Sequence, residues 1–371
     1  MDSRVPGITF DQQGICSHCA LHDKLDKLYT LNSQNKKKFE TLLNKIKISG
    51  KNNKYDCVVG LSGGVDSTYC LYTAKRLGLR PLAFHYDNGW CTAIAKKNIE
   101  KAIRKLDVDL EKVEFPWEDI KMFHRACLQA SIPETCLPCE VGIASGAYKV
   151  AAKYNIKYIM LGTSFRTEGI NPLRWHYLDG AYFNDIIKKF GQLTSATKNF
   201  NKLTMPDLFK YIVVKGIKTI QLPLYIEYNN QSIKAIMEKE LDWEYGGKIH
   251  FDCSYKPFGG YVEKQKFGGR DPGLIALAAL VRSKEMTREA ALEKIQADDS
   301  TPVSQKDIDY CRQRLGFSTE ELQDILKSPP KTFLDYSTYY SVFSKLRLPI
   351  KACCKMKLLP ETLYEKFFTV V

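Results

Sequence analysis

The chain has 371 residues, of which 44% are hydrophobic, and it carries a net charge of +13. This length exceeds the usual size of one hydrophobic core, so we expect more than one domain. No apolar run approaches the roughly 18 residues of a membrane span, and the first residues lack the basic and apolar parts of a secretory signal. These properties predict a soluble, cytoplasmic, globular protein rather than a membrane-spanning or secreted one.

Much of the positive charge lies in two segments, 35–54 and 188–219, which are rich in lysine and contain few acids. One interpretation is a solvated surface that keeps the protein soluble. The other is attraction for polyanions such as RNA, nucleotide-sugars or phosphate-bearing lipids. No RNA-binding motif accompanies the lysines, so the lysine-rich surface does not decide between the two interpretations, and nucleic acid is a possible partner that no motif indicates.

Residues 1–50 are expected to form a small N-terminal module with a CSHC motif, followed by a basic helix over about 35–48. Residues 51–225 then alternate between short runs of apolar and β-branched residues and runs with apolar residues at helical spacing. We expect strands at 55–61, 81–87, 110–115, 157–162 and 218–224, and helices at 65–78, 92–106 and 141–154. This alternation predicts an α/β fold, a Rossmann-like parallel sheet with helices on both faces.

Residues 226–371 are expected to form a mainly helical C-terminal domain. Apolar residues recur there at helical spacing, and the runs are separated by short polar breaks. The predicted helices cover residues 231–241, 272–284, 287–295, 304–316 and 318–327.

The stretch VVGLSGGVDSTYCLYTAKRLG, residues 58–78, predicts a strand, a phosphate-binding turn and a helix. Two glycines let backbone N–H groups crowd around an anion, and the helix N-terminus adds partial positive charge. An aspartate in such a turn is explained if it holds Mg²⁺ against the phosphate oxygens. The predicted phosphate site consists of Ser62, Gly63, Gly64, Val65, Asp66 and Ser67.

The SGGVDS stretch resembles the signature of the PP-loop ATP pyrophosphatases, also called adenine nucleotide alpha hydrolases. The resemblance implies that the loop grips the pyrophosphate of ATP while a substrate oxygen attacks the α-phosphate. The adenylated substrate then loses AMP to a nitrogen or sulfur nucleophile. The stretch FHYDNGW implies contacts to adenosine from Asp87 and Asn88, and LGTSFRTEG places Gly162 and Thr163 near the nucleotide.

A closer resemblance covers most of the chain. The stretches VPGITFDQQGICSHC, KYDCVVGLSGGVDSTY, RPLAFHYDNGW, KYIMLGTSFRTEGI, YGGK and MTREAALEKI are similar to the N-acetyl sugar amidotransferases of surface-polysaccharide biosynthesis. The resemblance implies conversion of an acetamido group on a sugar or nucleotide-sugar into an acetamidino group. It also implies a separate glutaminase subunit as the source of ammonia, which agrees with the lack of a recognisable glutaminase domain in this chain.

Two CxxC pairs leave the transferred atom open. Cys16 and Cys19 correspond to half of a four-cysteine zinc site in the amidotransferase family, so Zn²⁺ is one expectation. Cys136 and Cys139 lie where PP-loop sulfurtransferases hold a 4Fe–4S cluster, and Cys253 is the candidate third ligand. This alternative predicts thiolation of a sugar, base or tRNA; a pair that only packs, or that joins Cys16 and Cys19 at zinc, is the other interpretation.

The segment EYGGKIHFDCSYK, residues 244–256, contains a glycine pair followed by Lys248. A lysine after such a tight loop can reach a phosphate as a point charge. We therefore expect Lys248, together with Asp66, to act in catalysis by contacting the pyrophosphate or a substrate phosphate. A surface lysine beside a turn is the alternative.

Overall fold

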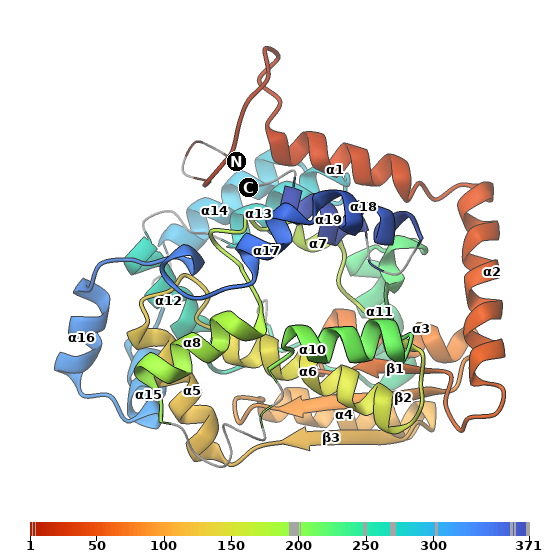
Figure 1. The fold of residues 1–371 in the computed structure, drawn as a ribbon, viewed down its shortest axis with the longest axis horizontal. Coiled ribbons are helices and arrows are strands. Elements are labelled where there is room, and N and C mark those ends of the chain that lie inside the picture. Colours follow the sequence, from red (N-terminus) through yellow and green to blue (C-terminus); the bar gives the residue numbers. More distant parts are fainter. Residues whose placement is uncertain are drawn as a thin grey trace.

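A single parallel sheet organises the molecule (Figure 1). The structure is a computed structural model that describes residues 1, 3, 5–192, 200, 202–247, 251–267, 272–300, 303–356, 359 and 361–368. The strands are β1 (Cys57–Gly60), β2 (Pro81–Asp87), β3 (Leu110–Glu114), β4 (Tyr158–Leu161) and β5 (Lys218–Gln221). Their order across the sheet is β3-β2-β1-β4-β5, and all neighbouring pairs are parallel. The predicted α/β fold is therefore confirmed.

The sheet is buried on both faces because successive side chains of each strand point to opposite sides. Val58 packs into one core and its neighbour Val59 into the other. The same alternation separates Ile159 from Met160 on β4. The apolar strand runs in the sequence thus reflect two cores, one on each face of the sheet.

Helices from the first half of the chain cover the two faces. One core includes residues of α2 (Ser33–Gly50), α3 (Val65–Arg76) and α4 (Ala93–Leu106). The other includes residues of α5 (Trp117–Gln129), α6 (Leu137–Lys153) and α8 (Gly180–Phe190). From β1 the chain adds β2 and β3 on one side of the sheet and then β4 and β5 on the other, so the switch point lies between β1 and β4. Open α/β sheets bind ligands in the crevice at such a switch point.

The N-terminal residues and several connections add shorter elements. Around the CSHC motif the chain forms α1 (Ser17–Leu28), a helix that begins directly at the cysteine pair. The remaining elements before residue 225 are α7 (Phe165–Glu168), α10 (Met205–Leu208), the π-helix η1 (Phe209–Val214) and the 3₁₀ turn η2 (Leu222–Leu224).

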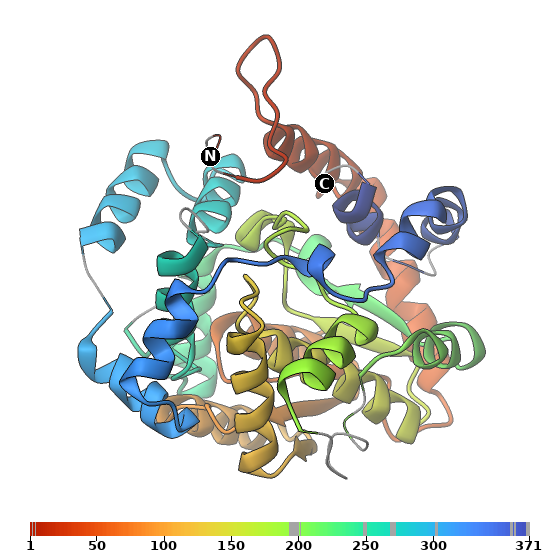
Figure 2. The ribbon, with the colours of Figure 1, turned by 60° about the vertical axis from the view of Figure 1, so that its left-hand side comes forward.

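The C-terminal region is helical, as predicted, and it wraps back onto the sheet domain (Figures 1 and 2). It comprises α11 (Asn230–Leu241), α12 (Lys256–Phe267), α13 (Pro272–Arg282), α14 (Arg288–Ser300), α15 (Gln305–Leu315), α16 (Thr319–Lys327), the 3₁₀ turn η3 (Phe333–Asp335), α17 (Tyr340–Lys345), α18 (Arg347–Lys355) and α19 (Glu361–Phe368). Helix α11 packs on α3 and α4, while α13 packs on α1 and α7. Among the described residues, no helix combines the length and apolarity needed to cross a membrane.

Because the C-terminal helices contact the sheet domain at many points, the boundaries predicted at residues 50 and 225 stay predictions. Cys91 and Cys253 form an isolated antiparallel bridge across the second of them. The Ser254 N–H also donates to the Trp90 carbonyl at 2.9 Å. The chain segments on either side of residue 225 therefore build one continuous structure around the carboxyl end of β2.

Helix α6 lies directly against the sheet, which predicts a strict size limit at Gly142. A Cβ atom there would meet the Tyr86 ring at 2.3 Å. We expect Gly142→Ala to lower the free energy of unfolding by about 1–3 kcal/mol through overpacking. Gly260→Ala is the matched control, because no atom lies within 4 Å of its Cβ position. Urea unfolding should show a loss only for Gly142→Ala, and equal stability of both variants would contradict this packing.

Candidate active site

The SGGVDS loop connects β1 to α3 at the switch point of the sheet. The Ser62 and Ser67 hydroxyl oxygens lie 3.0 Å apart, and the Ser62 N–H donates to Ser67 Oγ at 3.1 Å. The Gly64 N–H donates to Ser62 Oγ at 3.3 Å, and Gly64 is the N-cap of α3 without a side-chain cap. Hydroxyls, backbone N–H groups and a helix N-terminus therefore converge on one spot, as in anion-binding loops.

Gly63 is fixed by its surroundings on both sides. Its φ is +84°, a conformation that favours glycine, and an added Cβ would lie 2.3 Å from the Ala95 carbonyl oxygen. Its own carbonyl accepts hydrogen bonds from Trp243 Nε1 at 3.0 Å and from Asn98 Nδ2 at 3.3 Å. The loop is thus held in shape by α4 and by a tryptophan from the C-terminal region.

Asp66 lies in the first turn of α3, and the Tyr228 hydroxyl donates a hydrogen bond to its Oδ1. Burial raises the pKa of the Asp66 carboxyl; the bond from Tyr228 opposes this rise, and the negative charge of Asp252 adds to it. Asp252 also approaches the loop, since its Oδ2 lies 3.2 Å from the Cβ position of Gly64. Two carboxylates beside a phosphate loop fit Mg²⁺, which binds through one or two carboxylates plus phosphate oxygens.

The loop after β4 closes the other side of the crevice. At Gly162 a Cβ atom would lie 2.4 Å from the Asp66 carbonyl oxygen, so the two backbones are in direct contact. Thr163 Oγ1 accepts a hydrogen bond from Gln221 Nε2 at 3.3 Å. The structure therefore brings Gly162 and Thr163 to the SGGVDS loop, and their contact with a nucleotide stays a prediction.

Asp87 and Asn88 lie at the carboxyl end of β2, where the fold places ligand-binding residues. Asp87 accepts the Gly89 N–H at 3.0 Å and pairs with Lys112 at 3.1 Å. Although burial opposes it, these two partners hold the pKa of Asp87 below its ordinary value. Asn88 donates from Nδ2 to Cys139 Sγ at 3.2 Å, which links this loop to the CxxC pair of α6.

Three of the predicted cysteines lie in one region. Cys136 is the N-cap of α6 and Cys139 lies in the first turn, where its Sγ is 3.5 Å from His124 Nε2. Burial raises the pKa of both thiols, and the nearby Cys253 adds to the rise in each. The fold therefore brings Cys136 and Cys253 near each other although 116 residues separate them. Within the described ranges, no three His, Cys, Asp or Glu side chains are arranged to hold one metal ion.

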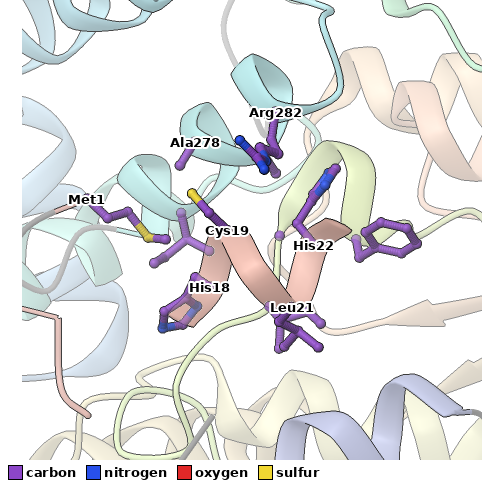
Figure 3. Close-up of a pocket in the computed structure, with 12 residues that line it drawn as sticks. Met1, His18, Cys19, Leu21, His22, Ala278 and Arg282 are labelled. Atoms are coloured by element: carbon purple, nitrogen blue, oxygen red, sulfur yellow. The ribbon is translucent and has the colours of Figure 1, made fainter. Parts of the chain in front are cut away.

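Cys16 and Cys19 lie elsewhere, on α1 beside α7 and α13 (Figure 3). Cys16 Sγ accepts the Cys19 N–H at 3.3 Å, and its contacts with Cys19 lower the pKa of the Cys16 thiol to about 6. Cys19 borders a small, largely apolar pocket with Arg282, and Figure 3 shows the His18 side chain turned to another side of the helix. The geometry thus lends no support to a zinc site at this pair.

Glu168 was not singled out from the sequence. Its side chain is exposed to water, yet burial raises the pKa of its carboxyl to about 8. Part of the side chain reaches the surface, while the protein around the carboxyl disfavours its charged form. Asp66 and Glu140 raise this pKa further and Lys256 lowers it, so these charged groups lie near the Glu168 carboxyl.

Sequence reasoning also missed Tyr228, Trp243 and Asp252. Each lies more than 140 residues from the loop residue that it contacts, so no local pattern could reveal the contact. Glu168 was within reach, because it follows β4 by seven residues in the stretch that already suggested Gly162 and Thr163. The predicted catalytic residue Lys248 lies outside the described residues, and its role stays a prediction.

Comparison with known proteins relates part of the chain to a family. Residues 224–347 match the family described as LPS biosynthesis protein WbpG-like, C-terminal domain. No curated protein sequence matches the chain significantly. Among solved structures, NMN synthetase from Francisella tularensis is similar over 76% of this chain and 97% of its own, with 13% sequence identity and a TM-score of 0.35. The family match supports the resemblance to lipopolysaccharide-related enzymes that the sequence indicated.

The raised pKa of Glu168 predicts a pH-dependent stability. The folded-state pKa of about 8 exceeds the ordinary 4.5, so the protonated carboxyl stabilises the fold and this contribution is lost as pH rises between these values. Glutamine cannot ionise. We therefore expect the melting temperature of the wild type to fall relative to Glu168→Gln over that interval. The control is Glu293→Gln, an exposed position on α14; identical pH profiles for wild type and Glu168→Gln would contradict the raised pKa of Glu168.

Proposed function

We propose that this chain, a relative of the WbpG-like lipopolysaccharide biosynthesis proteins, is an ATP-dependent PP-loop enzyme that transfers nitrogen to a sugar. Its substrate would be an acetamido sugar or nucleotide-sugar, and its product the acetamidino sugar. The observation that carries the proposal is the SGGVDS loop, which converges hydroxyls, N–H groups and a helix N-terminus at the switch point of the sheet.

In the first step the acetamido oxygen attacks the α-phosphorus of ATP, and pyrophosphate leaves. The loop residues Ser62, Gly64 and Ser67 are placed to bind the leaving pyrophosphate. Asp66 and Asp252 would hold Mg²⁺, which neutralises charge that develops on the phosphates. In the second step ammonia attacks the imidate carbon, AMP leaves with the acetamido oxygen, and one proton is released.

The second step needs a source of ammonia and a group that accepts the proton. We propose that a separate glutaminase subunit supplies ammonia. We propose that the reacting carbon lies between the loop and Glu168, because the charge of Asp66 acts on the Glu168 carboxyl. Glu168, with its pKa near 8, is suited to take a proton near neutral pH.

A direct test supplies ATP, an acetamido nucleotide-sugar and an ammonium salt to the purified protein and measures pyrophosphate, AMP and sugar product. Asp66→Asn should lower pyrophosphate release by about a hundredfold, since roughly 3 kcal/mol of metal-mediated stabilisation is lost. Asp324→Asn, an exposed position on α16, should leave it unchanged. Near-normal release from Asp66→Asn would reject the assignment, and the absence of ammonium-dependent AMP would reject nitrogen transfer.

The three cysteines favour a second candidate, ATP-dependent sulfur transfer. Asn88 connects Cys139 to the carboxyl end of β2 through a hydrogen bond. Just beyond that strand, the backbones of Cys91 and Cys253 form the isolated β-bridge. The three thiols therefore lie near the carboxyl end of β2. Burial raises the pKa of Cys136 and Cys253, and Lys256 opposes that rise in both. In a cubane each cysteine binds a different iron, so the lack of a single-ion arrangement is compatible with a cluster. Cys136, Cys139 and Cys253 would hold such a cluster, which would supply sulfide chemistry there.

Anaerobic purification separates the two candidates. If the cysteines hold a cluster, the wild type should contain iron and absorb in the visible range. Replacing Cys136, Cys139 or Cys253 by alanine should then remove both signals without loss of ATP binding. Cys353→Ala, on α18, is the control and should retain them. Iron-free wild type together with ammonium-dependent turnover would exclude the sulfur candidate.

A further inference from the structure

Two segments that reach the surface combine exposed apolar side chains with basic residues and no acid. Residues 208–226 contain three lysines and no acid, and residues 336–360 contain four lysines, one arginine and no acid. Together they hold eight positive charges in a chain whose net charge is +13. We call the surface formed by the described residues of these two segments the basic–apolar face.

The most exposed large hydrophobic residues concentrate on this face. Among the described residues, six exceed 60% exposure, and five of them belong to the two segments: Leu348 at 77%, Val214 at 70%, Val213 at 62%, Phe209 at 61% and Met356 at 61%. Such residues lose contact with water only when another phase or molecule covers them. Because these residues lie on basic segments, we expect the surface that covers them to carry negative charge.

Packing on the inner side fixes the direction in which these residues point. On η1 the Tyr211 ring is buried and stacks on Tyr148 of α6 at 5.5 Å, which leaves Phe209, Val213 and Val214 facing out. On α18, Ile350 and Cys354 pack into a small core with α19, which leaves Leu348 outside. The exposure therefore comes from structured helices rather than from loose chain ends.

The two segments lie on one side of the molecule. The Met205 N–H at the start of α10 donates to the Tyr339 hydroxyl at 3.5 Å, just before α17. The Thr362 hydroxyl of α19 donates to Gln221 of β5 at 3.3 Å. In Figure 1 α10 and α17 both lie toward the viewer.

We propose that the basic–apolar face docks on an anionic lipid surface. Apolar side chains would enter the boundary between headgroups and acyl chains, while lysines and Arg347 contact anionic headgroups. Most of the exposed apolar residues are aliphatic, whereas single-stranded nucleic acid is bound chiefly by stacking on aromatic rings. The acids that border the two segments in sequence are Asp207, Glu227, Asp335 and Glu361. Asp207 and Asp335 are engaged in capping boxes, whereas Glu227 is exposed at the edge of the first segment.

Co-sedimentation with lipid vesicles tests this inference independently of the enzymatic proposal. The full chain should bind vesicles of phosphatidylcholine mixed with phosphatidylglycerol, and high salt should weaken the binding because it screens the charges. Vesicles of phosphatidylcholine alone should bind at least about tenfold more weakly. Equal binding to both kinds of vesicle, or to neither, would overturn the proposal.

Two sets of substitutions separate the contributions. The apolar set, Val213→Ser, Val214→Ser and Leu348→Ser, should reduce binding at every salt concentration. The charge set, Lys210→Glu and Lys351→Glu, should reduce it mainly at low salt. Each variant should keep the melting temperature and ATP-dependent activity of the wild type, which shows that it is folded.

The matched control is Leu292→Ser with Lys294→Glu on α14, which changes one exposed apolar and one exposed basic residue outside the basic–apolar face. This control should bind anionic vesicles like the wild type. An equal loss in the control would show that only overall charge matters. Conversion of a dimer to a monomer by the apolar set, or binding of RNA but not of vesicles, would assign the face to self-association or to nucleic acid and overturn the proposal.

Discussion

The contact on which the candidate site depends is the one between the backbones of Gly162 and Asp66. An added Cβ at Gly162 would lie 2.4 Å from the Asp66 carbonyl oxygen, so no side chain fits between the loop after β1 and the loop after β4. On the other flank, Gly63 meets Ala95 equally closely. These two approaches set the width of the crevice and the direction in which the N-terminus of α3 points. The side chains at the site therefore surround a loop whose backbone is held between Gly162 and Ala95.

The C-terminal region completes the site rather than merely covering it. Trp243 holds the Gly63 carbonyl, Tyr228 binds the Asp66 carboxyl, and Asp252 brings a second carboxylate to Gly64. A loop of this kind binds phosphate by its backbone, which is common to many proteins. The surroundings of the loop therefore combine residues from before and after residue 225.

Local pattern was sufficient to predict the sheet, its strands and the phosphate loop. Each strand run is short, apolar and flanked by turns, and β1 is followed at once by the glycine pair. The sequence did not predict α5 and α8, which lie in stretches whose apolar residues serve a core shared with distant segments. It could not predict Tyr228 or Trp243 as site residues, because their contacts exist only once the chain has folded back. The cysteines were a mixed case: Cys136 and Cys253 do come together, while Cys16 and Cys19 lie apart from them.

Two contacts tie the sheet domain to the part of the chain after residue 225. They are the bridge between Cys91 and Cys253 and the hydrogen bond from Trp243 to the SGGVDS loop. The family match covers residues 224–347, and Tyr228 and Trp243 lie within it. This part of the chain contributes hydrogen bonds to the SGGVDS loop itself. A chimera that joins this sheet domain to the C-terminal part of a distant relative would therefore lose the hydrogen bonds from Tyr228 and Trp243 to the loop, unless that relative supplies equivalent residues.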